Sequence, residues 1–172
     1  MVVGGSLGAK SINEAIDHNL KVFAQDNLQL IWQTGIPYFE KAKEAVKGIQ
    51  GTYVKDFITQ MDNAYAAADV IISRSGAMAV AELCLVQKPV IFVPFPFAAE
   101  DHQTANASAL VAKDAAISIK DSNVTSGLVP ALINLLQDTT KQINMKNNIA
   151  ALGVKNADEI IAAEILKNIK ST

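Results

Sequence analysis

The chain has 172 residues, half of them apolar, and a formal net charge of −2 at pH 7. This length suits a single domain with a hydrophobic core, and the scattered lysines form no basic stripe of the kind that binds nucleic acid. The chain has a single cysteine, Cys84, which excludes an internal disulfide and is expected to be a buried thiol. No apolar run reaches the roughly 18 residues of a membrane span, and residues 1–20 lack the pattern of a signal peptide. We therefore expect a cytoplasmic protein.

Strand and helix patterns alternate from the N-terminus to about residue 138. Apolar runs predict strands at residues 1–4, Leu28–Gln33, Thr52–Lys55, Val70–Ser73, Val90–Val93 and Ala116–Ile119. Amphipathic stretches predict helices at Ser11–Ala24, Tyr38–Val46, Met61–Ala68, Met78–Val86 and Gln103–Ala112, followed by a helical tail from Thr125. Because strands that alternate with helices form parallel sheets, we expect one α/β domain over residues 1–172, with a doubly wound, Rossmann-like, mainly parallel sheet of six strands.

The first predicted strand is unusually short. Strands usually have about five or six residues, but Met1-Val2-Val3 runs directly into a glycine loop. A strand that feeds such a loop normally lies inside a sheet. We therefore expect the chain to be a truncated piece of a longer protein.

That glycine loop, Gly4-Gly5-Ser6-Leu7-Gly8, precedes a helix that is expected to begin near Ala9. Glycines at this place let a phosphate approach the backbone, where the helix N-terminus offers free N–H groups. A dinucleotide site also needs an acid at the end of the second strand, but that strand ends in Gln33-Thr34-Gly35. No Gly-Lys-Ser/Thr follows the glycines either, so the pattern disfavours NAD and a P-loop and leaves another phosphate site or a plain tight turn.

A second loop, Ser73-Arg74-Ser75-Gly76, follows the fourth predicted strand and holds the only arginine of the chain. Ligands of doubly wound sheets bind beyond the strand ends where the winding reverses, so Ser6 and Ser75-Gly76 are expected to face the same phosphates. Glu82 lies on the following helix and suits the two hydroxyls of a ribose. The residues alone leave one alternative for each of these side chains. Glu82 could be a solvated helix acid, and Arg74 could form a structural bridge to a carboxylate.

A third polar cluster follows the fifth predicted strand, where Pro94-Phe95-Pro96 leads into Glu100-Asp101-His102-Gln103 and Asn106. These side chains suit recognition of sugar hydroxyls or acid–base chemistry. Glu100 or Asp101 as a helix cap is the alternative, and from the cluster alone it is the favoured one.

Together, these motifs resemble one family. The segments Gly4-Gly5-Ser6-x-Gly8-Ala9, Ser73-Arg74-Ser75-Gly76-Ala77 with Glu82, Val93-Pro94-Phe95 and Asp101-His102-Gln103-x-x-Asn106-Ala107 occur in the order found in the C-terminal half of the bacterial peptidoglycan glycosyltransferases of family 28. That family adds N-acetylglucosamine from UDP-N-acetylglucosamine to undecaprenyl-diphosphate-linked muramyl-pentapeptide, which converts lipid I to lipid II. The resemblance covers nearly the whole chain and implies half of an inverting, two-domain GT-B enzyme that needs no cofactor and no protein-held metal.

The resemblance also implies roles for individual residues in binding UDP-N-acetylglucosamine. Gly5 and Ser6 would contact the diphosphate, with Gly76 and Arg74 close to it, and the backbone at Phe57 and Ile58 would recognise uracil. Met78 would pack near the nucleoside, Glu82 would hold the ribose hydroxyls, and Gln103 with His102 would contact the sugar. Some members of the family have Gln-Gln where this chain has His102-Gln103, which leaves the role of His102 open.

The acceptor half of such enzymes precedes the donor half and is not part of this chain. Catalytic residues are therefore expected mainly in that half, and the isolated chain is expected to bind the donor without transferring sugar. The full-length enzyme is expected on the cytoplasmic face of the inner membrane, where the other half would meet the lipid-linked acceptor. Two alternatives to this function remain. The chain could be half of another UDP-sugar transferase or of an epimerase, or it could be a non-catalytic nucleotide-binding subunit.

Overall fold

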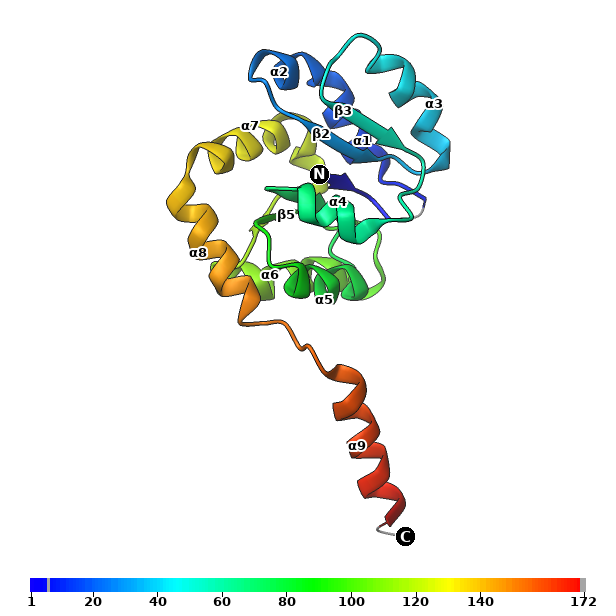
Figure 1. The fold of residues 1–172 in the computed structure, drawn as a ribbon, viewed down its shortest axis with the longest axis vertical. Helices are drawn as coiled ribbons and strands as arrows, with labels where there is room; N and C mark the ends of the chain where they lie inside the picture. Colours follow the sequence, from blue (N-terminus) through cyan, green and yellow to red (C-terminus); the bar gives the residue numbers. More distant parts are fainter. Residues whose placement is uncertain (6, 171–172) are drawn as a thin grey trace.

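The computed structural model describes residues 1–5 and 7–170, without the side chain of Lys170. Six strands in this part of the chain form one sheet, and every pairing in it is parallel (Figure 1). The strands are β1 (Val2–Val3), β2 (Leu30–Gln33), β3 (Thr52–Lys55), β4 (Ile71–Ser73), β5 (Val90–Phe92) and β6 (Ile117–Ser118), in the order β3-β2-β1-β4-β5-β6. The predicted six-stranded sheet is confirmed, and its winding reverses between the neighbours β1 and β4.

The helices also follow the predicted alternation. They are α1 (Lys10–His18), α2 (Leu20–Gln25), α3 (Ile36–Ala45), α4 (Met61–Ala67), α5 (Ala77–Val86), α6 (His102–Val111), α7 (Val124–Gln137), α8 (Thr139–Ala150) and α9 (Ala157–Lys170), with short 3-10 turns η1 (Ala99–Asp101) and η2 (Asp121–Asn123). The prediction of a single helix over Ser11–Ala24 is wrong, because the helix is interrupted at Asn19. The Asn19 amide donates to the Ala15 carbonyl at 2.8 Å, and its backbone (φ −113°, ψ 12°) leaves the helical region.

The inner strands are covered by helices on both faces. Val2, Ile72 and Ile91 pack with side chains of α1, α2 and α7, whereas Val3, Ile71 and Phe92 pack with side chains of α4, α5 and α6. Because successive strand residues point to opposite faces, continuous apolar runs are what a doubly wound sheet requires. Cys84 is buried on the same face of the sheet as Val3, Ile71 and Phe92, as expected.

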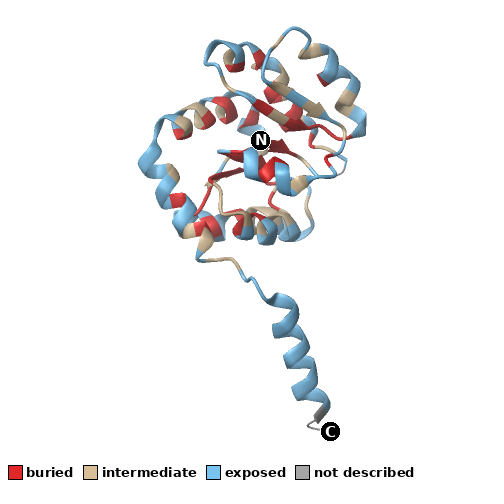
Figure 2. Ribbon diagram, viewed as in Figure 1, coloured by how far each residue is buried: buried red, intermediate tan, exposed pale blue. Residues whose placement is uncertain are grey.

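Helix α9 stands away from the rest of the protein and is exposed along its length (Figures 1 and 2). The described residues contain no helix that is both long and apolar enough to cross a membrane.

Candidate functional site

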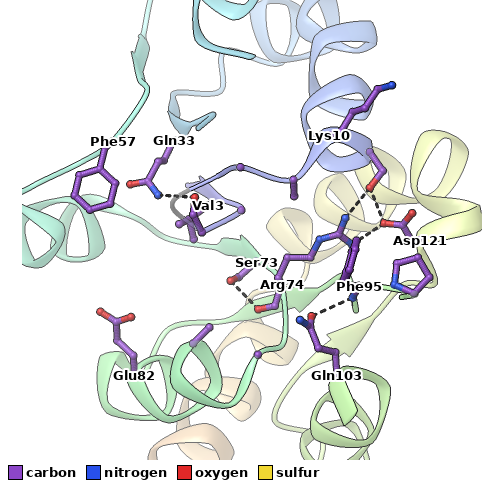
Figure 3. Close-up of a pocket in the computed structure, with 18 of the residues that line it drawn as sticks. Val3, Lys10, Gln33, Phe57, Ser73, Arg74, Glu82, Phe95, Gln103 and Asp121 are labelled. Carbon is purple, nitrogen blue, oxygen red and sulfur yellow. Dashed lines mark hydrogen bonds and ion pairs between the residues drawn. The ribbon is translucent and has the colours of Figure 1, made fainter. Parts of the chain in front are cut away.

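A cavity of about 910 Å³ opens at the carboxyl ends of the strands, across the point where the winding reverses (Figure 3). Its walls come from the loops after β1, β3, β4 and β5, from the segment after β6, from the end of β2 and from residues of α1, α4, α5 and α6. Such a volume is typical of a site for a nucleotide-sized ligand. Six residues that the resemblance assigns to the ligand line it: Gly5, Phe57, Arg74, Gly76, Glu82 and Gln103.

Two helices begin at this cavity. Helix α1 begins after Ala9 and helix α5 after Gly76, and no side-chain cap is seen for either one among the described residues. The first N–H groups of a helix lack partners within the helix, and the dipole makes this end positive. The cavity therefore offers two places where the phosphates of an anionic ligand are stabilised.

The glycines of the loop after β1 are needed for different structural reasons. Gly5 has a left-handed backbone (φ +82°), and a Cβ built on it meets nothing within 4 Å, so its backbone is open to an approaching ligand. Gly8 is also left-handed (φ +76°), but a Cβ there would overlap the Thr34 carbonyl oxygen. The loop thus packs directly on the end of β2, and only Gly5 fits the expected role of admitting a phosphate. Ser6 lies outside the described residues.

Arg74 lies at the centre of a network that joins four segments. Its Nη1 contacts Asp121 Oδ1 at 2.6 Å and donates to the carbonyl oxygens of Val93 and Pro94, both at 3.1 Å. Its Nη2 donates to Ser11 Oγ at 3.0 Å, and its guanidinium lies 5.4 Å from the Phe95 ring centroid. The bridge to a carboxylate, one of the two alternatives for this arginine, is confirmed.

Arg74→Lys is expected to lower the free energy of unfolding by about 1–2 kcal/mol, because one ammonium group cannot reproduce the planar fork of donors that reaches Asp121, Ser11 and two carbonyl groups. Urea unfolding measures the loss. A lysine variant as stable as the original protein would contradict the structural role of the guanidinium.

Ser75 does not face the cavity as expected. Ser75 is fully buried, and its hydroxyl donates to the backbone carbonyl of Gln103 at 2.8 Å. Asn106 Nδ2 in turn donates to the backbone carbonyl oxygen of Ser75 at 3.0 Å. Gln103 Oε1 accepts from the N–H groups of Ser75 (3.3 Å) and Phe95 (3.0 Å). Ser75 and Gln103 therefore tie the loop after β4 to the loop after β5, and Gln103 alone of the two also lines the cavity.

Glu82 lies on α5, across the cavity from Gln33 and Phe57 (Figure 3). Its carboxylate is exposed and lies beside Tyr65 of α4, which lines the same cavity. Burial and the neighbouring Glu82 raise the pKa of the Tyr65 hydroxyl, so this group stays a hydrogen-bond donor at neutral pH. Glu82 is thus reachable from the cavity and oriented by one neighbour.

Three other predicted residues do not line the cavity. Met78 is 85% exposed on the first turn of α5, and the exposed His102 has its Nδ1 2.6 Å from the Ala99 carbonyl oxygen. Ile58 is buried, and its N–H donates to Gln33 Oε1 at 2.9 Å. The side-chain helix cap considered for Asp101 is wrong, because the Asp101 carboxylate accepts from the Thr104 hydroxyl instead of a backbone N–H of α6.

The sequence did not predict several residues that line the cavity, among them Gln33, Tyr65, Phe97 and Asp121. Gln33 carried a signal in the sequence, because it is the last residue of a strand whose carboxyl end borders the cavity. Asp121 had none, because its contact with Arg74 joins residues 47 positions apart.

Comparisons with known proteins agree on one family. Residues 1–161 match the model of the glycosyltransferase family 28 C-terminal domain. The UDP-N-acetylglucosamine–N-acetylmuramyl-(pentapeptide) pyrophosphoryl-undecaprenol N-acetylglucosamine transferases of Parabacteroides distasonis and Bacteroides thetaiotaomicron are 46% and 45% identical over 98% and 97% of the chain. The crystal structure of Acinetobacter baumannii MurG superimposes with a TM-score of 0.84 at 33% identity, over 96% of the chain and 48% of that structure. The chain spans 46% of the length of each of the two transferases.

Proposed function

The chain belongs to the glycosyltransferase family 28 C-terminal domains, and from this premise we propose that it is the UDP-N-acetylglucosamine-binding half of the enzyme that converts lipid I to lipid II. The observation that carries the proposal is the cavity itself, which is lined by two helix N-termini, by the open backbone of Gly5 and by Glu82. Positive helix ends suit a diphosphate, and a carboxylate suits the two hydroxyls of a ribose.

The roles of single residues in this proposal are those that the family resemblance implies. The diphosphate contacts Gly5, Ser6 and the helix end at Gly76, close to Arg74, while the backbone at Phe57 and Ile58 meets the uracil. Glu82 holds the ribose, Gln103 and His102 contact the N-acetylglucosamine, and Met78 lies near the nucleoside. Gln103 is supported in this role because it lines the cavity and is held in place by two backbone N–H groups.

Transfer of the sugar needs a second half of the protein. The known relatives are about twice as long as this chain, and we assign the lipid-linked acceptor, most of the catalytic groups and the contact with the cytoplasmic face of the membrane to that other half. The 172-residue chain then binds the donor without turning it over.

Calorimetric titration of the chain with UDP-N-acetylglucosamine, UDP, UDP-glucose and NAD tests the proposal. We expect the two uridine diphosphate sugars and UDP to bind, UDP-N-acetylglucosamine more tightly than UDP-glucose, and NAD not to bind. Binding of NAD in place of UDP would overturn the assignment of the cavity. Transfer of N-acetylglucosamine to a lipid I analogue by the isolated chain would overturn its inactivity.

A further inference from the structure

Gln33, at the end of β2, joins the two loops that the proposed function assigns to the two ends of UDP. Its side-chain Nε2 donates to the Gly5 carbonyl oxygen at 3.2 Å, and its Oε1 accepts from the Ile58 N–H at 2.9 Å (Figure 3 shows the first of these bonds). The residue is 3% exposed, yet it lines the cavity. Both polar ends of this amide are therefore used, and each one holds a different loop.

The sheet order explains why this residue reaches both loops. Strand β2 lies between β1 and β3, and Gln33 is in register with Val3 on one side and Lys55 on the other. Gly5 follows Val3 by two residues and Ile58 follows Lys55 by three, so both backbones pass beside the Gln33 side chain. No other residue of β2 stands at the carboxyl end between the two loops.

The chemistry of an amide suits this position better than that of the acid found there in dinucleotide sites. An ionised carboxylate only accepts hydrogen bonds, whereas an amide donates and accepts at once. The contact with the Gly5 carbonyl requires a donor, and the contact with the Ile58 N–H requires an acceptor. A glutamate in place of Gln33 would satisfy only the second.

We propose that Gln33 is a positioning residue that fixes the glycine loop and the Phe57–Ile58 backbone relative to each other, so that the diphosphate and the base of a uridine nucleotide bind as one unit. This inference rests on the proposed function, which assigns Gly5 to the diphosphate and the backbone at Ile58 to the base. A site whose two halves are held in place before binding loses less conformational entropy when the ligand enters. Gln33 thereby contributes both to affinity and to discrimination between bases.

Two variants separate the two contacts. Gln33→Met keeps the approximate shape of the side chain and removes both hydrogen bonds, so we expect UDP affinity to fall about tenfold and the preference for UDP over CDP to shrink towards unity. Gln33→Glu keeps an acceptor for the Ile58 N–H and loses the donor to Gly5. For this variant we expect weaker UDP binding with the preference for UDP over CDP retained.

The experiment is a calorimetric titration of each protein with UDP, CDP and pyrophosphate, with thermal unfolding in parallel. Gln142→Met is the matched control, because the Gln142 amide also donates to two backbone carbonyls, those of Leu135 and Leu136, but does not line the cavity. The control is expected to lose stability and to keep the UDP/CDP affinity ratio. A Gln33→Met protein that loses stability but keeps this ratio would show a merely structural glutamine and overturn the inference.

The same data distinguish the inference from the function on which it rests. If the unaltered chain binds UDP no better than CDP, base recognition in the proposed function is wrong, and the coupling through Gln33 is wrong with it. If the unaltered chain prefers UDP and both Gln33 variants keep that preference at full affinity, only the positioning role is overturned.

Discussion

Glu82→Ala is expected to weaken UDP binding about 10- to 100-fold. In the proposed site the Glu82 carboxylate accepts hydrogen bonds from the ribose hydroxyls, and hydrogen bonds to a charged group contribute roughly 1.5–3 kcal/mol each. At about 1.4 kcal/mol per factor of ten, the loss of this pair corresponds to one or two orders of magnitude in the dissociation constant. Glu82 is exposed on α5, so its removal leaves no cavity in the core, and folding should be unaffected.

The sign of the effect separates this role from that of a solvated surface acid. UDP carries negative charge, so removal of a nearby carboxylate that makes no contact would slightly strengthen binding by reducing repulsion. A ligand without the 2′-hydroxyl gives a second test. The unaltered chain should bind 2′-deoxy-UDP more weakly than UDP, whereas Glu82→Ala should bind both alike, since the interaction has already been removed.

Glu40→Ala is the matched control for this prediction. Glu40 is an exposed helix acid on α3 and does not line the cavity, so the control should bind UDP as the unaltered chain does. Unchanged or tighter UDP binding by Glu82→Ala, with this control normal, would refute the assignment of Glu82 to the ribose.

The fold could be predicted from the sequence because its signals are local. Continuous apolar runs such as Val70–Ile72, followed by small residues and then a helix, specify a strand with both faces covered, and this pattern is repeated along the chain. The break at Asn19 was missed because the amphipathic pattern continues through it. A side-chain hydrogen bond to Ala15 competes with the helix there, and periodicity does not record such a bond.

The candidate site was predictable where a residue lies in a loop at a strand end or on the helix that follows this loop. Gly5, Gly76 and Glu82 were predicted in this way, and all three line the cavity. Residues whose surroundings come from distant segments were misjudged. Ser75 was expected at the phosphates, but its partners are Gln103 and Asn106, 28 and 31 residues further along the chain. The role of Gln33 could not be predicted from the sequence, because the two loops that it joins become neighbours only in the folded sheet.

Gly8→Ala is expected to lower the free energy of unfolding by about 3–5 kcal/mol, the largest stability loss that we predict for this chain. The added Cβ would be strained by the left-handed backbone of Gly8 (φ +76°), which costs roughly 1–3 kcal/mol for a residue other than glycine. It would also overlap the Thr34 carbonyl oxygen, and Gly35 on the same strand end packs against Leu7 and Gly8 in return, so the backbones cannot separate without loosening the loop. For a chain of this size the melting temperature should fall by roughly 10 °C.

Two further alanine variants resolve the steric part of this loss from the conformational part. Gly48 (φ +81°) and Gly5 (φ +82°) have the same left-handed backbone, but a Cβ on either meets nothing within 4 Å. Gly48→Ala and Gly5→Ala should therefore each cost only about 1–2 kcal/mol of stability. Gly5→Ala should in addition weaken UDP binding, because its methyl group would occupy the space through which the diphosphate approaches, whereas Gly48→Ala should bind UDP normally. Equal stability losses in all three variants would show that the close packing of the glycine loop on β2 contributes nothing beyond backbone strain.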